Sequence, residues 1–198
     1  MSKLLLATFN LGKAREYLAL LEGIPYQITT LLQQGIGEIV AESGSSYEDN
    51  ALLKAVTYAK LGRITALADD SGLEVDALDG RPGVKSARFA GEAATDEDKV
   101  DIILTGLQGV PWDKRTACYK CVIAIATPEG QTNVCYGECR GIIALEARGE
   151  NGFGYDPVFF VPELGKTMAE LPPETKNTIS HRAQAGLKAR ELLMRLRV

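Results

Sequence analysis

The sequence predicts a mixed α/β protein built on one twisted β-sheet, with helices packed around it. Short apolar runs that resemble strands, at 3–8 and 26–30, alternate with segments whose apolar residues have helical spacing. Two longer runs, 117–126 and 132–143, flank a Pro-Glu-Gly sequence and predict a long antiparallel hairpin. A further short strand is expected at 158–161.

Four segments have the apolar spacing of amphipathic helices. The first follows Asn10, which can cap it, and the third follows Thr95, which has an acid three residues later as in a capping box. The second extends from Tyr47 to about Leu61, and the last begins at Ser180. Residues 33–46 hold three glycines without a clear period and are expected to be mostly loop.

Two adjacent carboxylates end an apolar run in the segment LADDSGLEVD, residues 67–76. We predict short strands at 64–68 and 73–78 on either side of a Ser-Gly turn. Two carboxylates about 4 Å apart in a partly buried site repel by roughly 4 kcal/mol, so a divalent cation is expected beside them. Because side chains alternate along a strand, Asp69 and Asp70 would point to opposite faces, with Asp70 better placed to face an open cleft.

Mg²⁺ is the cation that these residues favour, because it binds one or two carboxylates and keeps several waters. Glu42, in the irregular stretch AESG, is the second candidate ligand beside Asp70. A structural alternative is that Asp69 or Asp70 caps the turn through an Asx hydrogen bond.

Composition and charge exclude several classes of protein. The 22 basic and 26 acidic residues give a net charge of 22 − 26 = −4, so nucleic acid is not the expected partner, although local basic residues could hold one phosphate group. No apolar run approaches the ~20 residues of a membrane span, and MSKLLLATFN is too short for a signal segment. A cytoplasmic protein with a single domain over 1–198 is therefore expected.

The cysteines form a C-x2-C and a C-x3-C pair, spacings that also occur in zinc sites. Both pairs lie in predicted strands, where residues three apart face opposite sides. Reduced thiols packed in a sheet are therefore expected, with a zinc site as the alternative. The residues concerned are Cys118, Cys121, Cys135 and Cys139.

Two segments supply groups suited to a nucleotide. In TFNLGK, residues 8–13, the N–H groups of a helix start and the ammonium of Lys13 could hold phosphate. The segment lacks the glycines of a Walker motif, and an ordinary βα turn is the alternative. In NGFGYDPVFF, residues 151–160, glycines flank Phe153, which could stack on a base or instead enter the core.

The segment TKNTISHRAQA, residues 175–185, places positive side chains in the first turn of the last helix. Ser180 as N-cap leaves His181 and Arg182 where their charge opposes the helix dipole, which a bound anion or polar ligand would explain. Lys176 adds a donor, and a surface imidazole is the alternative for His181, the only histidine. Together with the acids and the two loops, this set describes a nucleoside triphosphate site.

The motifs T-x-N-x-G-K, E-x-G, D-N-A-x-x-K-A, ADDSGL, PGVKSARF, GFGYDP and SHR follow one another from about Leu4 to the last helix. In this order the sequence resembles the inosine triphosphate pyrophosphatase family. The resemblance implies an α/β fold of two lobes around a long twisted mixed sheet flanked by helices, a nucleotide groove between the lobes, and a homodimer. It also implies Mg²⁺-dependent hydrolysis of dITP, ITP and XTP to the monophosphate and pyrophosphate, which would cleanse the nucleotide pool.

Carried over by position, the resemblance gives each candidate residue a role. Asp70 would be the general base for the attacking water, and Glu42 and Asp70 would be the metal ligands. The residues expected to bind phosphates are Thr8, Phe9, Asn10, Leu11, Gly12 and Lys13, assisted by Lys54, with Ser71 touching the substrate. The base pocket would consist of Phe153, Gly154, Tyr155 and Asp156, with recognition by Lys176, His181 and Arg182.

Some positions depart from the pattern of the family without removing a proposed catalytic residue. Phe9 replaces a residue that is often small, Asp49 stands where Glu is common, and Glu150-Asn151 replaces a frequent Thr-Gly. Phe9 and Glu150 could alter loop geometry and therefore substrate preference. Two alternatives stay open: a nucleotide-binding regulator without turnover, and a related pyrophosphatase with another base preference.

Overall fold

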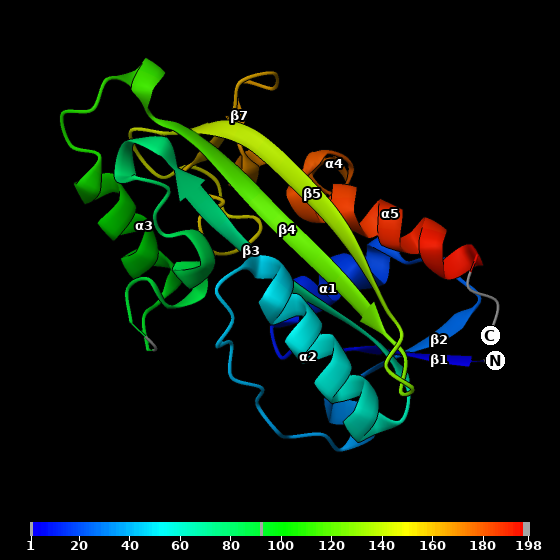
Figure 1. Cartoon of the computed structure of the whole chain (residues 1–198). Helices are drawn as coiled ribbons and strands as arrows, with labels where there is room; N and C mark the ends of the chain where they lie inside the picture. Colours follow the sequence, from blue (N-terminus) through cyan, green and yellow to red (C-terminus); the bar gives the residue numbers. More distant parts are fainter. Residues whose placement is uncertain (1, 92, 196–198) are drawn as a thin grey trace. The chain divides into compact units, whose positions relative to one another are not determined.

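The computed structural model describes residues 2–91 and 93–195, and within them it contains a seven-stranded sheet of order β2-β1-β3-β4-β5-β6-β7 (Figure 1). β1 pairs in parallel with β2 and β3, whereas β6 pairs antiparallel with β5 and β7. The mixed α/β fold predicted from the sequence is therefore confirmed. The strands are β1 (Ser2–Leu6), β2 (Tyr26–Thr30), β3 (Thr65–Val75), β4 (Thr116–Ala126), β5 (Thr132–Ile143), β6 (Phe159–Val161) and β7 (Lys166–Thr167).

Three of the helices begin where the local sequence supplies a capping side chain, which is Asn10, Ser46 or Thr95. The side chain of Asn10 accepts the N–H of Lys13 at the start of α1, and Thr95 and Asp98 form the expected capping box of α3. The helices are α1 (Leu11–Leu20), α2 (Tyr47–Gly62), α3 (Asp96–Gly106), α4 (Pro173–Ile179) and α5 (His181–Arg195). α4 and β7 were not predicted. The apolar spacing of the predicted last helix, Ala185, Ala189, Leu192, Leu193 and Leu196, includes one residue, Leu196, that lies outside the described residues.

The predicted turn at Ser71-Gly72 is wrong, because β3 continues without interruption from Thr65 to Val75. β3 lies between β1 and β4 in the sheet. The pairing with β1 ends at Leu67, so at Ser71-Gly72 the neighbouring strand is β4, and its pairing outweighs the cost of one internal glycine. The segment predicted as the six-residue strand 73–78 also ends earlier, since Asp76–Leu78 forms a 3₁₀ turn.

Contacts divide the described chain into two compact units. Unit 1 consists of Met1–Asp70, Cys121–Gly137 and Arg182–Val198, and unit 2 consists of Ser71–Lys120 and Glu138–His181. The single domain expected over the whole chain stays a prediction, and so does the groove that the family resemblance implies.

In unit 1, helices cover both faces of the strands (Figure 1). Leu4 and Leu6 of β1 share a buried cluster with residues of α1 and α5, such as Tyr17 and Ala185. The intervening Leu5 points to the α2 side, where its Cδ2 lies 3.2 Å from the position of a Cβ built on Gly62. Alternate residues of each strand therefore face either α1 and α5 or α2, and this alternation separates the two aspartates of β3.

Unit 2 has its own hydrophobic cluster. α3 contributes Val100 and Ile103, and β6 contributes Phe159 and Val161. Tyr119 of β4 is part of the same cluster. Unit 2 therefore has a core against which the segment after β5 can pack.

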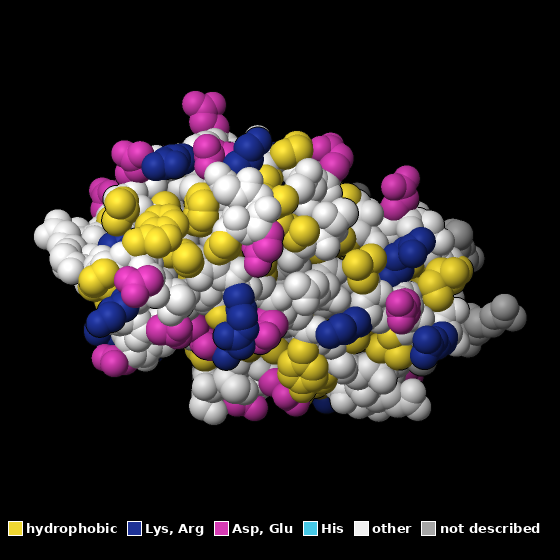
Figure 2. Space-filling model, turned by 90° about the horizontal axis from the view of Figure 1, so that it is seen from above, with side chains coloured by type: hydrophobic (Ala, Val, Ile, Leu, Met, Phe, Trp, Pro, Cys, Tyr) yellow, Lys and Arg dark blue, Asp and Glu magenta, His cyan; other side chains and the backbone are white. Residues whose placement is uncertain are grey.

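Three further expectations concern the cysteines, the surface charge and membrane-spanning segments. All four cysteines are buried and unbridged, as expected for thiols packed in strands. Figure 2 shows acidic and basic side chains interspersed with hydrophobic ones over one face, in keeping with the small net charge. Among the described residues, no helix is both long and apolar enough to cross a membrane.

Candidate functional site

Asp70 ends the part of β3 in unit 1 and points to the α2 face, where it is 5% exposed. Asn50 donates from Nδ2 to Asp70 Oδ2 at 3.0 Å, and Lys54 Nζ lies 3.8 Å from Oδ1. Asn50 and Lys54 are four residues apart on α2 and therefore share one face of the helix. One helical face thus holds both oxygens of this carboxylate.

Glu42 reaches the same ammonium from the irregular segment before α2. Its Oε1 lies 2.6 Å from Lys54 Nζ. The N–H of Gly44 donates to Asn50 Oδ1 at 2.8 Å, and a Cβ on Gly44 would lie 2.5 Å from the Cβ of Asp49. The glycine therefore allows the close approach that fixes this segment to α2.

The charges around Asp70 perturb its protonation. Burial raises the pKa of Asp70, while the nearby charges of Lys54 and Lys13 oppose this rise. Burial lowers the pKa of Lys54, but the carboxylates of Asp69, Asp70 and Glu42 outweigh it and raise the pKa overall. The ammonium of Lys54 is therefore held as a cation between two carboxylates.

Asp69 faces the opposite side of β3, as the alternation along the strand predicted. Its Oδ2 lies 2.9 Å from Lys13 Nζ of α1 and 3.6 Å from Arg182 Nη2 of α5. Arg182 Nη1 also donates to Glu16 Oε2 at 2.7 Å. Burial by itself would raise the pKa of Asp69, but the positive charges of Lys13, Arg182 and Lys54 together hold it well below its usual range.

The segment from Thr8 to Lys13 forms a capped turn into α1. The N–H of Asn10 donates to Thr8 Oγ1 at 3.1 Å, and the N–H of Lys13 donates to Asn10 Oδ1 at 3.0 Å. Phe9 is 41% exposed, and its ring meets that of Tyr58 edge-on with centroids 6.5 Å apart. The large residue at this position therefore packs against α2.

In unit 2, Asp156 organises the loop after β5. Its Oδ2 accepts the N–H of Phe153 at 2.9 Å and forms a buried ion pair with Lys176 Nζ. The ammonium of Lys176 also lies 4.9 Å from the centroid of the Phe153 ring, within the range of a cation–π contact. The aromatic ring, the ammonium and the carboxylate predicted for base recognition are therefore assembled in one unit.

Two contacts from elsewhere in unit 2 hold this loop. Asp96, in the first turn of α3, accepts the N–H of Gly154 at 2.6 Å. Tyr155 donates from its hydroxyl to the carbonyl of Ser86 at 2.8 Å, and Ser86 Oγ accepts the N–H of Leu73. The PGVKSARF segment therefore holds the loop through the carbonyl of Ser86.

Gly152 and Gly154 provide a matched test of this loop. Both have positive φ, but a Cβ on Gly152 would lie 2.0 Å from Asp156 Oδ2, whereas nothing lies within 4 Å of a Cβ on Gly154. We expect Gly154→Ala to lower the free energy of unfolding by about 1 kcal/mol through backbone strain. Gly152→Ala should cost about 3 kcal/mol or more, because it displaces one partner of a buried ion pair. Urea unfolding measures both, and equal losses would contradict this reading of the loop.

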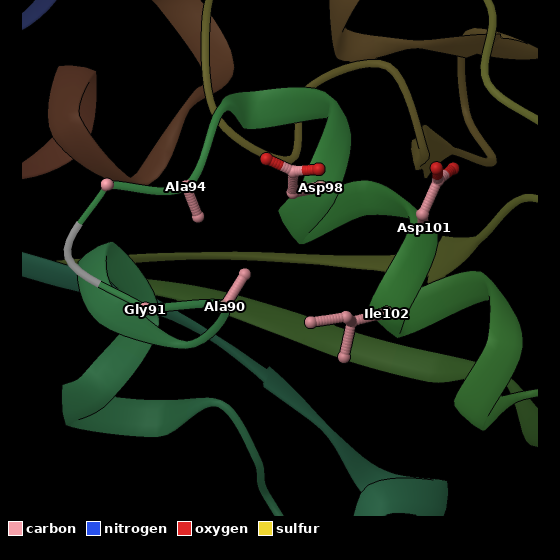
Figure 3. A pocket seen from close by; sticks show the side chains of 7 residues that line it. Ala90, Gly91, Ala94, Asp98, Asp101 and Ile102 are labelled. Atoms are coloured by element: carbon pink, nitrogen blue, oxygen red, sulfur yellow. The ribbon is translucent and has the colours of Figure 1, made fainter.

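A pocket of about 670 Å³ lies beside α3 (Figure 3). Asp98 and Asp101 come from α3, and Ala90 and Gly91 from the preceding segment. The Asp98 carboxylate already accepts the N–H of Thr95 at 2.8 Å. Among the described residues, those that line this pocket include none of the predicted site residues.

The comparison with protein-family models decides the family. The Ham1 family model matches residues 4–192. The chain belongs to the Ham1 family. The sequence resemblance to inosine triphosphate pyrophosphatases is confirmed by this match and by the relatives of the chain.

The relatives of this Ham1 chain are similar over nearly their full length. A dITP/XTP pyrophosphatase of Desulforamulus reducens is 52% identical over 195 residues, which cover 98% of this chain and 96% of the relative. A dITP/XTP pyrophosphatase of Geobacter sulfurreducens is 49% identical and covers 93% of each chain. The structure of a HAM1 protein from Coxiella burnetii is 40% identical, covers 98% of this chain and 100% of that one, and has a TM-score of 0.89.

The structure distributes the predicted site residues of this Ham1 protein between the two units. Unit 1 holds Thr8 to Lys13, Glu42, Lys54, Asp70 and Arg182. Unit 2 holds Ser71, Phe153 to Asp156, Lys176 and His181. Within unit 1, Lys54 meets both predicted metal ligands; within unit 2, Asp156 meets Phe153 and Lys176.

Sequence reasoning missed residues that hold the predicted ones in place. Asn50 has a signal that could have revealed it, because it is a polar residue on the stripe Tyr47, Ala51 and Ala55 that α2 buries. Tyr119 has no such signal in the sequence, since a tyrosine in an apolar strand is usually just a residue of the hydrophobic core.

Proposed function

We propose that this protein hydrolyses the non-standard purine nucleoside triphosphates dITP, ITP and XTP to the monophosphate and pyrophosphate. The observation that carries the proposal is the arrangement at Asp70, a buried carboxylate held by Asn50 and sharing the ammonium of Lys54 with Glu42. The relatives that are named dITP/XTP pyrophosphatases support the same substrate class.

In this proposal Asp70 is the general base. Burial raises its pKa, and a more basic carboxylate takes a proton more readily from the water that attacks the α-phosphorus. Asn50 keeps one oxygen occupied and so orients the other. Lys13 and Lys54 would neutralise the triphosphate and stabilise the negative charge that develops on the leaving pyrophosphate.

Glu42 and Asp70 are the residues that would hold Mg²⁺. The donor set fits, because both are carboxylates and both already lie near one cation, the ammonium of Lys54, at 2.6 and 3.8 Å. Among the described residues, no group of three or more His, Cys, Asp or Glu side chains is arranged around a metal position. Bound Mg²⁺ supplies positive charge to the phosphate oxygens.

Base recognition is assigned to the loop Phe153 to Asp156 with Lys176 and His181. Hypoxanthine and xanthine present O6 as an acceptor, whereas adenine presents an amino donor that would meet another donor here. The guanidinium of Arg182 is 2% exposed and already bonds Glu16. We therefore favour the N–H groups at the start of α5 over this guanidinium as the donors to O6.

A substrate panel tests the function. Pyrophosphate release is measured with Mg²⁺ on dITP, ITP, XTP, GTP, ATP, dTTP and dUTP. We expect dITP, ITP and XTP to be turned over at least about tenfold more efficiently than ATP, the effect of one mismatched polar group. A preference for dTTP or dUTP would favour a pyrophosphatase of another base preference. Binding without pyrophosphate would favour the non-catalytic regulator.

Removal of the metal provides a separate prediction. Excess EDTA should lower turnover of dITP by about 10²-fold or more, because several kcal/mol of charge stabilisation are lost. Re-addition of Mg²⁺ in excess of the chelator should restore the rate. The measurement is pyrophosphate release before and after each step, and undiminished turnover in EDTA would refute the Mg²⁺ assignment.

The homodimer and the cytoplasmic location that the sequence suggested stay predictions.

A further inference from the structure

Tyr119 connects two recognition residues of unit 2 that come from different parts of the chain. Its ring stacks on the imidazole of His181, with centroids 4.5 Å apart and planes inclined by 10°. Its hydroxyl donates to Asp156 Oδ1 at 3.4 Å. Tyr119 lies on β4 and is 6% exposed. One buried side chain therefore contacts both partners.

The bond from Tyr119 completes the fixation of the Asp156 carboxylate. Asp156 Oδ2 receives the N–H of Phe153 and the ammonium of Lys176, and Oδ1 receives the hydroxyl. With both oxygens engaged, the carboxylate cannot rotate without breaking at least one contact. The position of the Lys176 ammonium over the Phe153 ring therefore depends on the group that holds the far oxygen.

The stacking contact fixes the plane of the imidazole. The χ2 torsion of histidine is soft, so the ring plane is set by its neighbours rather than by its own rotamer. A nearly parallel ring at 4.5 Å selects one plane. Tyr119 is itself held by Phe159, whose ring centroid lies 4.5 Å away within the same hydrophobic cluster.

We propose that Tyr119 is a positioning residue for recognition of the purine base, acting through His181 and Asp156. The inference deepens the proposed function and rests on it. It assigns to the tyrosine the orientation of the His181 imidazole and, through the Asp156 carboxylate, of the Lys176 ammonium, both of which belong to the groups proposed to recognise the base. The ring sets the imidazole plane, and the hydroxyl sets the carboxylate and, through it, Lys176.

Two variants separate the two contacts. Tyr119→Phe keeps the stacked ring and removes the hydroxyl, and the KM for ITP should rise about threefold with kcat unchanged, as for a long hydrogen bond to a carboxylate. Tyr119→Leu removes the ring as well. Its KM for ITP should rise about tenfold, and the ratio of kcat/KM for ITP over ATP should fall by a similar factor.

NMR spectroscopy can detect the stacking of Tyr119 on His181 in the protein without nucleotide. His181 is the only histidine of the chain, so its imidazole proton signals are unambiguous in an NMR spectrum. The face of the tyrosine ring should shift these signals upfield in the wild type and in Tyr119→Phe, and the shift should be lost in Tyr119→Leu. Loss of a purely structural contact elsewhere in the core would not produce this pattern.

Val161→Ala is the matched control, because it truncates a buried side chain in the same hydrophobic cluster. It should lower stability but leave the ITP over ATP ratio and the imidazole signals unchanged. A folded Tyr119→Leu variant with an unchanged ratio overturns the inference. If that variant does not fold, an unchanged KM in Tyr119→Phe overturns it. A wild type that hydrolyses none of the nucleotides overturns the proposed function instead.

Discussion

Asp70→Asn should lower the release of pyrophosphate from dITP by about 10³-fold, because an amide cannot accept the proton of the attacking water and a general base contributes typically 10²–10⁴ in rate. The side chains have nearly the same volume, and Asn50 and Lys54 keep a polar neighbour. The measurement is steady-state turnover with saturating Mg²⁺, beside urea unfolding of the same preparation.

The same variant should be at least as stable as the wild type. Burial raises the pKa of Asp70, so the ionised carboxylate is disfavoured in the folded state relative to the unfolded chain at neutral pH. This cost begins as pH rises above the unfolded pKa of about 3.9 and is complete above the folded pKa. The amide of the Asp70→Asn variant is neutral at every pH, so the variant does not incur this cost of ionisation. Lost activity together with retained or increased stability is the signature of a site residue.

Asp79→Asn is the matched control for this substitution. Asp79 is exposed and has a φ of 55°, a conformation that asparagine also adopts readily. Its activity and stability should equal those of the wild type. If Asp70→Asn keeps more than about a tenth of wild-type turnover, the base role is refuted. A loss of less than about tenfold is smaller than the ~10²-fold loss that removal of a general base causes at minimum.

The sequence predicted those parts of the fold that local chemistry decides. Asn10 and the box of Thr95 and Asp98 mark helix starts whatever the tertiary structure. The opposite directions of Asp69 and Asp70 were also predicted correctly, although the turn after them was not. Alternation depends only on the residues being in a strand, whereas the end of a strand depends on the neighbours that bond to it.

The helix and the strand that were not predicted, α4 and β7, are too short to show a periodic pattern of apolar residues. α4 has seven residues and begins at Pro173, and β7 has only Lys166 and Thr167. β7 exists because β6 offers it an edge to pair with. For the candidate site, the acids and the loops have recognisable motifs, but Tyr119 meets its partners only through the tertiary fold.

Asp69→Asn should lower the free energy of unfolding by about 3–5 kcal/mol, because it removes the carboxylate shared by the buried guanidinium of Arg182 and the partly buried ammonium of Lys13. Asp69 and Arg182 are 3% and 2% exposed, and the same carboxylate holds Lys13 at 2.9 Å. Turnover should also fall, since Lys13 loses the contact that sets its direction. Urea unfolding at pH 7 gives the stability change, and pyrophosphate release gives the rate.

The dependence of this loss on pH identifies its cause. The folded pKa of Asp69 lies below the unfolded value of about 3.9, so its ionised form stabilises the protein at all pH values above that. As pH falls below about 4, the unfolded chain takes up the proton first and the stabilisation diminishes. The difference between wild type and Asp69→Asn should therefore be constant from pH 7 to pH 5 and shrink below pH 4.

Glu16→Gln provides the comparison within the same cluster. It removes the other carboxylate that Arg182 bonds, but the guanidinium keeps Asp69 at 3.6 Å, and the side chain of Glu16 is more exposed. Its loss should be about 1–2 kcal/mol, that of one charged hydrogen bond. Equal losses in the two variants would mean that Asp69 is no more than one of several interchangeable partners. A larger loss in Asp69→Asn means that this carboxylate holds α1 and α5 to β3.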